Sequence, residues 1–579
     1  MNKRMNVDET AISLTTEVED AHAFKWIRRA AWTLGATMVA LLCVFDLGPP
    51  LTFNDDWGFA WSVRHLDWLH LHLYPSSSAL ALPQIVWGWL ASGGQGDQRL
   101  LRLSVVPLVL LAMWMLYRLA RLAGANKTWS VLAALAPLAF PVFSADATTF
   151  MSDVPYVALL LVAAYGAVRW ANEGGKRWVA LCVAFAILAT LQRQVGVLIP
   201  VAVTALMWLR PHGRAGWSKH DWVGLVLLWV GCVGAIVLPS LTGVAPPTQG
   251  TRITAALALQ PLYFRGALEY LPGMLGLALV PFLPGLALGL GRDRDWSWAK
   301  RWLLWLVIVD LVVYIWYLIL ARSDYTIFPG NVFSRYGFAS AVSWYQMGLK
   351  PYLFTLPVFG AIQILAADAL LAFAVRLKAW WPGRRQLPGM ALLLLAVTQF
   401  FPLGLVHYIP YDRYYLPAAL LLVPLAARAA SKTRMPILAA CVALALVAAG
   451  AVIYIVGEQD YQAWQVARNN AACLAYQYAL PGQVYAGYEA MAVYVEIPYY
   501  EQHGVILGGA AISTNPTYFS LTGPTQPVLS VRFAPSNDPR PGYNYSSLAS
   551  AKLVVAIGVN GPGLPIPAPT GTPACPLTK

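Results

Sequence analysis

Charged side chains are scarce in this chain of 579 residues: Asp, Glu, Lys and Arg together make up only 12% of it. Hydrophobic residues make up 58%, and the mean hydropathy is +0.56. Soluble domains carry about twice this share of charged residues. The composition therefore excludes an ordinary soluble protein and indicates a protein that crosses a membrane many times.

Cysteine is also scarce, and its spacing is not that of a metal site. The six cysteines form no CxxC pair, which excludes zinc fingers and thioredoxin-like redox motifs. Four of them fall in hydrophobic segments, where we expect inert packing residues. Only Cys473 and Cys575 lie in the polar C-terminal part, and they can form a disulfide if that part lies outside the cytoplasm.

Two sequence signals of other protein classes are missing. No GxxxxGK loop occurs, so direct use of a nucleoside triphosphate is not supported. Residues 1–24 are polar, of mixed charge and without an apolar core, which is typical of a cytoplasmic tail rather than a signal peptide.

Long apolar runs fill the chain from residue 25 to residue 456 and predict about thirteen transmembrane helices. The first runs from about Trp26 to Leu47, after Lys25. We expect the others near 100–119, 129–145, 154–171, 178–191, 195–210, 221–241, 270–291, 301–321, 352–376, 388–409, 414–430 and 436–456. Between the first two spans, the external loop 48–99 would hold an interfacial helix over 60–74 and a short juxtamembrane or re-entrant helix over 79–91.

The net charge of +13 follows from this topology. With the N-terminus inside, most of the 40 basic residues fall in the N-terminal tail and the short cytoplasmic loops, as the positive-inside rule requires. The positive charge therefore sets the orientation, and a nucleic-acid partner is excluded.

An odd number of spans sends residues 457–579 to the external side. This part is rich in Tyr, Pro, Gly and Asn, and strand-like runs occur at 483–486, 493–497, 528–533 and 553–557 between turn residues. A helix is also expected over 459–478. We predict a small α/β extracytoplasmic domain on an otherwise all-α polytopic bundle.

Acids and arginines from several loops are expected to meet on the external side. The first loop carries the adjacent acids Asp55 and Asp56, later loops carry Asp153 and Arg193, and Arg413 follows near the end. A carboxylate that accepts a proton from an acceptor, together with arginines that hold a phosphate leaving group, is what glycosyl transfer requires.

Four motifs make the chain resemble the type C membrane glycosyltransferases, the group that contains the protein O-mannosyltransferases and the lipid A aminoarabinose transferases. They are Asn54-Asp55-Asp56-Trp57, Arg99-Leu100-Leu101-Arg102, Phe150-Met151-Ser152-Asp153-Val154-Pro155 and Tyr411-Asp412-Arg413-Tyr414-Tyr415-Leu416-Pro417. The resemblance covers the membrane part and is weaker over the C-terminal part. This chain departs from the family in having Asp56 where a Glu is usual, and in lacking a tyrosine shortly after the pair.

The resemblance implies an inverting enzyme of the external leaflet of a membrane, most simply the bacterial inner membrane, with a polyprenyl-phosphate-linked sugar as donor and a lipid, glycan or protein as acceptor. It implies that Asp55 is the base or orients the acceptor, and that Asp56 and Asp153 assist. For a divalent ion, Asp55 and Asp153 are the candidate ligands. We expect Arg193, Arg335 and Arg413 to bind the phosphate, and further substrate contacts from Arg252, Tyr263, Arg265 and Lys350.

Simpler interpretations stay open beside these. Asp56 can be a helix cap, Asp153 can cap the fourth span, and Arg413 can form only an interfacial ion pair. Asp310 and Asp368 lie within predicted spans, where an acid is often functional. Two other functions are a lipid-linked sugar flippase, which needs a polar conduit, and a non-catalytic envelope-assembly protein, whose external acids need not converge.

Overall fold

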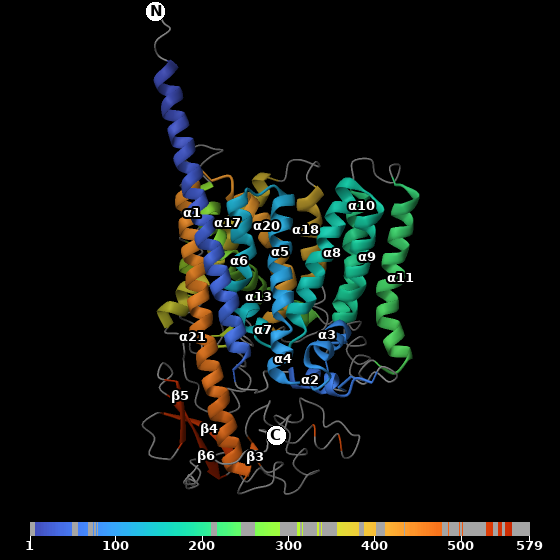
Figure 1. Cartoon of the computed structure of the whole chain (residues 1–579). Helices are drawn as coiled ribbons and strands as arrows, with labels where there is room; N and C mark the ends of the chain where they lie inside the picture. Colours follow the sequence, from blue (N-terminus) through green and yellow to red (C-terminus); the bar gives the residue numbers. More distant parts are fainter. Residues whose placement is uncertain are drawn as a thin grey trace, which may run out of the picture.

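The chain is a helical bundle with an extended polar end. The computed structural model describes the chain in segments, namely residues 6–48, 56–67, 73–74, 77, 79–209, 217–244, 261–289, 308, 310–312, 315, 333–334, 337–338, 356–380, 387–400, 411–433, 435–476, 484–485, 497, 501, 529–535, 542–546 and 551–557. The N-terminus and the strands of the C-terminal part lie at opposite ends of the bundle (Figure 1). We call the end that holds the strands the polar end.

Helices make up the bundle from one side to the other. The longer ones are α1 (Asn6–Asp46), α5 (Val106–Ala123), α6 (Lys127–Ala139), α8 (Asp153–Glu173), α9 (Lys176–Gln192), α10 (Ile199–Trp208), α11 (Lys219–Leu241), α13 (Pro261–Leu279), α17 (Leu356–Trp380), α18 (Leu387–Phe400), α20 (Leu416–Ala430) and α21 (Pro436–Tyr476). The shorter ones are α2 (Asp56–Arg64), α3 (Leu82–Ser92), α4 (Gln98–Leu103), α7 (Pro141–Ala147), η1 (Gln194–Leu198), η3 (Val280–Phe282), α14 (Leu283–Gly289) and η4 (Asp412–Tyr415).

Seven helices in the described part are long and apolar enough to cross a membrane, or eight if a bent pair counts as one span. They include α1, α8, α11, α17 and α21, so this is a multi-pass membrane protein. The count of thirteen spans stays a prediction. One boundary differs plainly: the last span was expected to end near residue 456, whereas α21 continues without a break to Tyr476.

The bent pair is α6 and α7, which meet at an angle of 69°. Pro137 lies inside α6 and Pro141 begins α7. A proline lacks the N–H group that a helix interior needs and clashes with the preceding turn, so two of them within five positions break the helix. The break turns α7 across the polar end of the bundle, where its last turn carries Asp146.

Local signals in the sequence start several helices. Asp97 accepts hydrogen bonds from the backbone N–H groups of Arg99 and Leu100 at the start of α4. Ser218 and Asp221 form a reciprocal capping box at the start of α11. Such caps satisfy backbone donors that have no partner within the helix.

The loop that follows α1 differs from the expectation in one respect. The interfacial helix predicted over 60–74 is instead α2, which begins at Asp56 and ends at Arg64. The eight residues from Asp56 to Val63 are all buried, so α2 is packed within the protein rather than lying on a membrane surface. Its aromatic residues Trp57 and Trp61 pack against Tyr74, and this contact favours burial over an interfacial position. The other short helix, α3, has 11 residues and is too short to span, as predicted.

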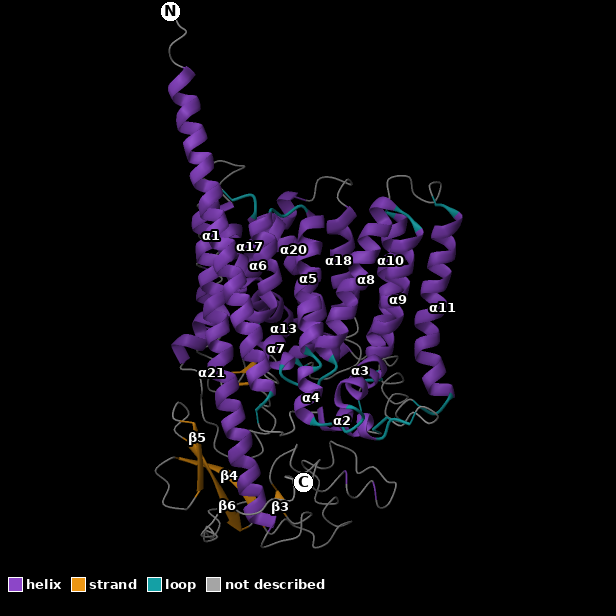
Figure 2. Cartoon of the chain, in the orientation of Figure 1, coloured by secondary structure: helices purple, strands orange, loops and turns teal. Residues whose placement is uncertain are grey.

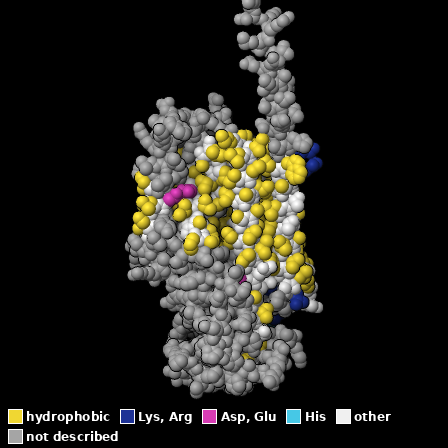
Figure 3. Space-filling view, turned by 90° about the vertical axis from the view of Figure 1, so that its left-hand side faces the viewer, with side chains coloured by type: hydrophobic (Ala, Val, Ile, Leu, Met, Phe, Trp, Pro, Cys, Tyr) yellow, Lys and Arg dark blue, Asp and Glu magenta, His cyan; other side chains and the backbone are white. Residues whose placement is uncertain are grey.

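The outside of the bundle is apolar. Large side chains such as Leu227, Val230 and Leu238 on α11 are exposed, which is unfavourable in water and favourable in lipid. Figure 3 shows a broad band of hydrophobic side chains with Lys and Arg near its two ends. An acidic patch lies within this band. The predicted intramembrane acids Asp310 and Asp368 interact with each other through a side-chain hydrogen bond.

The C-terminal part contains a four-stranded sheet beside the end of α21 (Figure 2). Its strands are β3 (Val484–Tyr485), β4 (Leu529–Pro535), β5 (Gly542–Ser546) and β6 (Ala551–Ile557), in the order β3-β4-β6-β5. The β3–β4 pair is parallel, and β6 is antiparallel to β4 and β5. Three strands match predicted runs, and β5 was missed because its Gly and Asn residues are typical of turns.

The remainder of the C-terminal part lies outside the described residues, so the α/β domain stays a prediction. Cys473, in the last turn of α21, is disulfide-bonded, whereas Cys43, Cys182, Cys232 and Cys441 are free. The four free cysteines are those expected to be packing residues.

Candidate active site

Asp153 lies between two arginines at the polar end of the bundle. It is the first residue of α8, after Ser152 at the N-cap position, and only 2% of its side chain is exposed. One carboxylate oxygen pairs with Arg193, and the other lies 3.9 Å from Nε of Arg413. A carboxylate at a helix N-terminus is also favoured by the helix dipole.

The two arginines reach Asp153 from distant parts of the chain. Arg193 follows the last residue of α9, and Arg413 lies in η4, just before α20. Both guanidinium groups stack on the ring of Tyr414, at 5.0 Å for Arg193 and 5.7 Å for Arg413. The stacking fixes the planes of the two groups through cation–π attraction.

Asp412 anchors this arrangement on its other side. Its carboxylate accepts a hydrogen bond from the backbone N–H of Phe333 at 2.6 Å and one from the backbone N–H of Arg413 at 2.9 Å. Phe333 begins the two-residue strand β1 (Phe333–Ser334), which pairs with β2 (Gly337–Phe338). The site therefore includes the backbone of Phe333, which precedes Asp412 by 79 residues in the sequence.

Asp146, in the last turn of α7, adds a further buried acid. Only 3% of the residue is exposed, and it interacts electrostatically with Asp153, Arg413 and Arg193. Its backbone carbonyl accepts a hydrogen bond from the hydroxyl of Thr149. The bend between α6 and α7 thus brings a third acid to the two arginines, after Asp153 and Asp412.

Two buried glutamines hold the neighbouring backbone in place. Nε2 of Gln192 donates to Oε1 of Gln84 at 2.7 Å, and Nε2 of Gln84 donates to the carbonyl of Phe150 at 2.8 Å. Gln192 also donates to the carbonyl of Ser152 at 3.3 Å. These bonds join the start of α3, the end of α9 and the turn before α8, so they position both Arg193 and Asp153.

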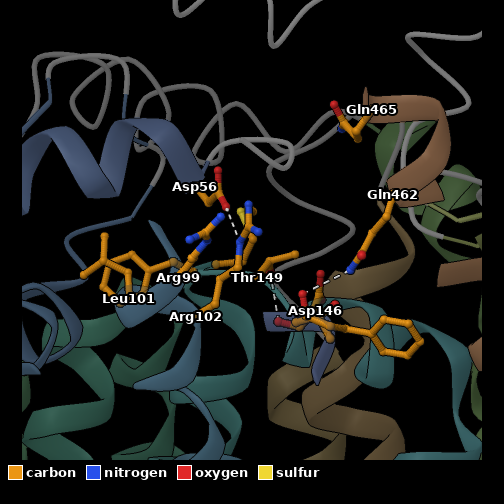
Figure 4. Close-up of polar contacts among 12 residues, drawn as sticks. Asp56, Arg99, Leu101, Arg102, Asp146, Thr149, Gln462 and Gln465 are labelled. Carbon is orange, nitrogen blue, oxygen red and sulfur yellow. Dashed lines mark hydrogen bonds and ion pairs between the residues drawn. The ribbon is translucent and has the colours of Figure 1, made fainter. Parts of the chain in front are cut away.

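Only one residue of the predicted acid pair of the first loop is among the described residues. Asp55 lies outside the described residues. Asp56 begins α2, is fully buried, and its Oδ2 lies 3.8 Å from Nε of Arg102 on α4 (Figure 4). Asp56 therefore forms an ion pair inside the protein.

The structure brings together three predicted site residues: Asp153, Arg193 and Arg413. Arg252, Arg335 and Lys350 lie outside the described residues, as do the side chains of Tyr263 and Arg265. Their roles stay predictions. Arg413 was also interpreted as forming only an interfacial ion pair. In the structure its guanidinium pairs with the buried carboxylate of Asp153.

A divalent cation does not fit the surroundings of Asp153. Both of its oxygens face guanidinium groups, which would repel a second positive charge. Within the described segments, no group of three His, Cys, Asp or Glu residues is placed to hold a metal ion.

Several residues of this region were not singled out as site residues from the sequence. The amides of Gln84 and Gln192 gave no signal, because a glutamine has no characteristic spacing. Asp46, at the end of α1, and Glu458, on α21, are fully or nearly fully buried acids. The position of Asp46 within the first apolar run could have indicated it, since ionisable residues there are rare.

Residues 79–239 match the model of the family described as dolichyl-phosphate-mannose-protein mannosyltransferase. We call these residues the mannosyltransferase-family segment. The matched segment contains the Arg99–Arg102 and Phe150–Pro155 motifs together with Asp153 and Arg193, and it confirms the resemblance to type C membrane glycosyltransferases. The Asp55-Asp56 pair and Arg413 lie outside the mannosyltransferase-family segment.

Solved structures give weaker likenesses. ArnT from Cupriavidus metallidurans in the apo state has a TM-score of 0.40 and 16% identity, over 90% of this chain and 97% of that one. The same protein bound to undecaprenyl phosphate has a TM-score of 0.39 and 15% identity, over 92% and 99%. The archaeal oligosaccharyltransferase AglB from Archaeoglobus fulgidus, with an inhibitory peptide and a dolichol-phosphate, has a TM-score of 0.37 and 15% identity, over 77% and 58%. These TM-scores are too low to support an argument. No curated protein matches the chain.

Proposed function

We propose that this protein is an integral membrane glycosyltransferase that moves a sugar from a polyprenyl phosphate to an acceptor at the external face of the membrane. The observation that carries the proposal is the ion-paired group of Asp153, Arg193 and Arg413 at the polar end of the bundle, in which Asp153 and Arg413 are buried. Both Asp153 and Arg193 fall within the mannosyltransferase-family segment. The name of that family gives dolichyl phosphate mannose as the donor, which supports a lipid-linked donor here.

Two arginines suit the leaving group of this reaction. When the bond between the sugar and the phosphate breaks, negative charge develops on the phosphate, and preorganised cations lower the energy of that state. A guanidinium carries five N–H donors, so it can bind a phosphate while keeping one contact with Asp153. The stacking of Arg193 and Arg413 on Tyr414 holds their planes in position before the donor arrives.

The base of the proposed reaction is Asp55. Its carboxylate accepts the proton of the acceptor hydroxyl or amine, the acceptor atom bonds to the anomeric carbon, and the polyprenyl phosphate leaves with the electrons of the broken bond. A single displacement of this kind inverts the anomeric carbon. Asp56 assists the base, which its ion pair with Arg102 supports. Asp153 holds the arginines in place, which its ion pair with Arg193 supports.

The external side is proposed on two further observations. The group of acids and arginines lies at the same end as the C-terminal strands and opposite the N-terminus (Figure 1). Cys473 at that end is disulfide-bonded, and disulfides persist mainly in oxidising compartments. We propose a bacterial inner membrane with a periplasmic C-terminal part, an undecaprenyl-type carrier, and a lipid, glycan or protein acceptor.

The test is sugar transfer by the full chain in vesicles that contain a polyprenyl-phosphate sugar. We expect Asp55→Asn to lower the rate by about 10²-fold or more, since a general base contributes 10² to 10⁴. The matched control is Asp97→Asn in the same loop, because Asn caps a helix as well as Asp does. If Asp55→Asn and Asp97→Asn transfer sugar equally well, the proposed role of Asp55 is wrong. Mass spectrometry of envelope glycolipids and glycoproteins with and without the gene would then identify the sugar and the acceptor.

A flippase or transporter is less well supported. The side chains of the two intramembrane acids Asp310 and Asp368 interact with each other. A cavity of about 500 Å³ between α9 and α11 is lined by apolar residues such as Ile187, Leu191 and Leu238. Neither acid lines this cavity, and an apolar cavity is not a conduit for a sugar. A non-catalytic assembly protein would not need the convergence of buried acids and arginines seen around Asp153.

A further inference from the structure

Arg102 has an unusual environment for an arginine near a membrane surface. It lies in the last turn of α4, and only 1% of its side chain is exposed. Its Nε lies 3.8 Å from the carboxylate of Asp56, which is fully buried. Figure 4 shows the two side chains pointing toward each other from α4 and α2.

Arg102 forms an ion pair with Asp56 and also interacts electrostatically with two further acids, Asp46 and Glu458. Glu458 accepts a hydrogen bond from Gln462 at 3.0 Å, whereas neither oxygen of Asp46 has a hydrogen-bond partner among the described residues. A buried charge is tolerated only when it is paired. The ion pair of Arg102 and Asp56 therefore joins α4 to α2, near acids carried by α1 and α21.

The neighbouring contacts make this meeting point rigid. Gln462 of α21 donates to the carbonyl of Phe45 at 3.3 Å. A Cβ at Gly48 would lie 2.8 Å from the carbonyl of Phe45 and 3.0 Å from Gln462, so the chain leaving α1 is closely packed against α21.

We propose that Arg102 is a positioning residue: it fixes the carboxylate of Asp56 at the start of α2, where Asp56 assists the base. This inference rests on the proposed function. A guanidinium serves this purpose better than an ammonium, because its planar fork can face more than one carboxylate.

The test compares Arg102→Gln and Arg102→Lys with Arg99→Gln in the vesicle assay. Arg99 is the matched control: it lies on the same helix, is exposed, and its Nε donates to the carbonyl of Gly48. We expect Arg102→Gln to lower kcat by about 10²-fold, as a misplaced catalytic group does, with the KM for the donor nearly unchanged. Arg102→Lys should fall between Arg102→Gln and the wild type, and Arg99→Gln should resemble the wild type.

A double variant separates positioning from a loss of folding. If Arg102 acts through Asp56, adding Asp56→Asn to Arg102→Gln removes the acid that Arg102 faces, so the double variant should be at least as active as Arg102→Gln alone. Thermal unfolding of each purified variant shows which ones are folded, and the Arg102→Lys variant, which keeps the charge, decides the matter if Arg102→Gln is not.

Two results would overturn the inference. One is an Arg102→Gln variant as active as Arg99→Gln. The other is a double variant whose kcat falls by the product of the two single effects. A wild type that transfers no sugar from any lipid-phosphate donor would instead reject the proposed function itself, and the inference with it.

Discussion

The guanidinium of Arg193 pairs with the carboxylate of Asp153, joining the end of α9 to the first turn of α8. Arg413 approaches the other oxygen of that carboxylate. Through Arg413, this carboxylate connects the mannosyltransferase-family segment to a motif near the end of the membrane part. Most of our predictions concern what happens when one partner of such a buried contact is removed.

Loss of one arginine should weaken the binding of the donor. For Arg193→Gln and Arg413→Gln we expect the Kd of a polyprenyl phosphate to rise by about tenfold to 10²-fold, because each charged hydrogen bond contributes about 1.5–3 kcal/mol. Binding of the carrier lipid to the full chain in detergent micelles measures this. The control is Arg29→Gln on α1, an exposed arginine; an equal loss of affinity there would show a general charge effect.

Asp153→Asn should destabilise the protein strongly. It leaves the buried guanidinium group of Arg413 and the partly buried one of Arg193 without their shared carboxylate, and breaking a buried pair costs about 3–5 kcal/mol. The control is Glu173→Gln, which breaks the exposed pair between Arg169 and Glu173 on α8 and should cost less than about 1 kcal/mol. Thermal unfolding in the same detergent compares the two, and equal midpoints would contradict the prediction.

The two buried glutamines should act as one unit. Gln84→Leu removes the acceptor of the 2.7 Å bond from Gln192 and the donor to the carbonyl of Phe150, at a cost of about 1–3 kcal/mol. Adding Gln192→Leu should cost less than the sum of the two single changes, because the groups lose the same bond. A double-variant cycle by thermal unfolding checks this, and strict additivity would show that the bond is not formed.

Gly166 should tolerate no side chain. A Cβ there would lie 2.8 Å from the backbone nitrogen of Cys182, so Gly166→Ala would push α8 away from α9. We expect a loss of about 1–3 kcal/mol. At Gly234, on α11, an added Cβ meets nothing within 4 Å, so Gly234→Ala should be neutral or slightly stabilising. Unfolding midpoints of the two variants in the opposite order would refute this packing.

The orientation can be tested at Cys473. If the C-terminal part is external, Cys473 should be oxidised in cells, so in denatured protein it should react with a maleimide only after reduction. Cys182 is free and is the control that reacts in denatured protein without reduction. A Cys473 that reacts without reduction would contradict an oxidising, external location.

Much of the site was predictable as residue types but not as contacts. The sequence indicated Asp153, Arg193 and Arg413 because charged residues are rare in so apolar a chain. It offered helix capping as an interpretation of Asp56, whereas Asp56 begins α2 and pairs with Arg102. The interfacial helix over 60–74 was wrong for a related reason: its apolar residues pack inside the protein, and the spacing of a helix does not say what its faces will meet.

Composition and motif order by themselves determined that the chain is a membrane protein and which residues are candidates for glycosyl transfer, because apolar length and charge placement are properties of single segments. Only the tertiary structure decided the partners. Asp153 meets two arginines, and Arg102 pairs with Asp56, because the 69° break between α6 and α7 and the long continuation of α21 bring distant segments to one end of the bundle. Such contacts depend on how helices pack against each other, and no local pattern of residues records that.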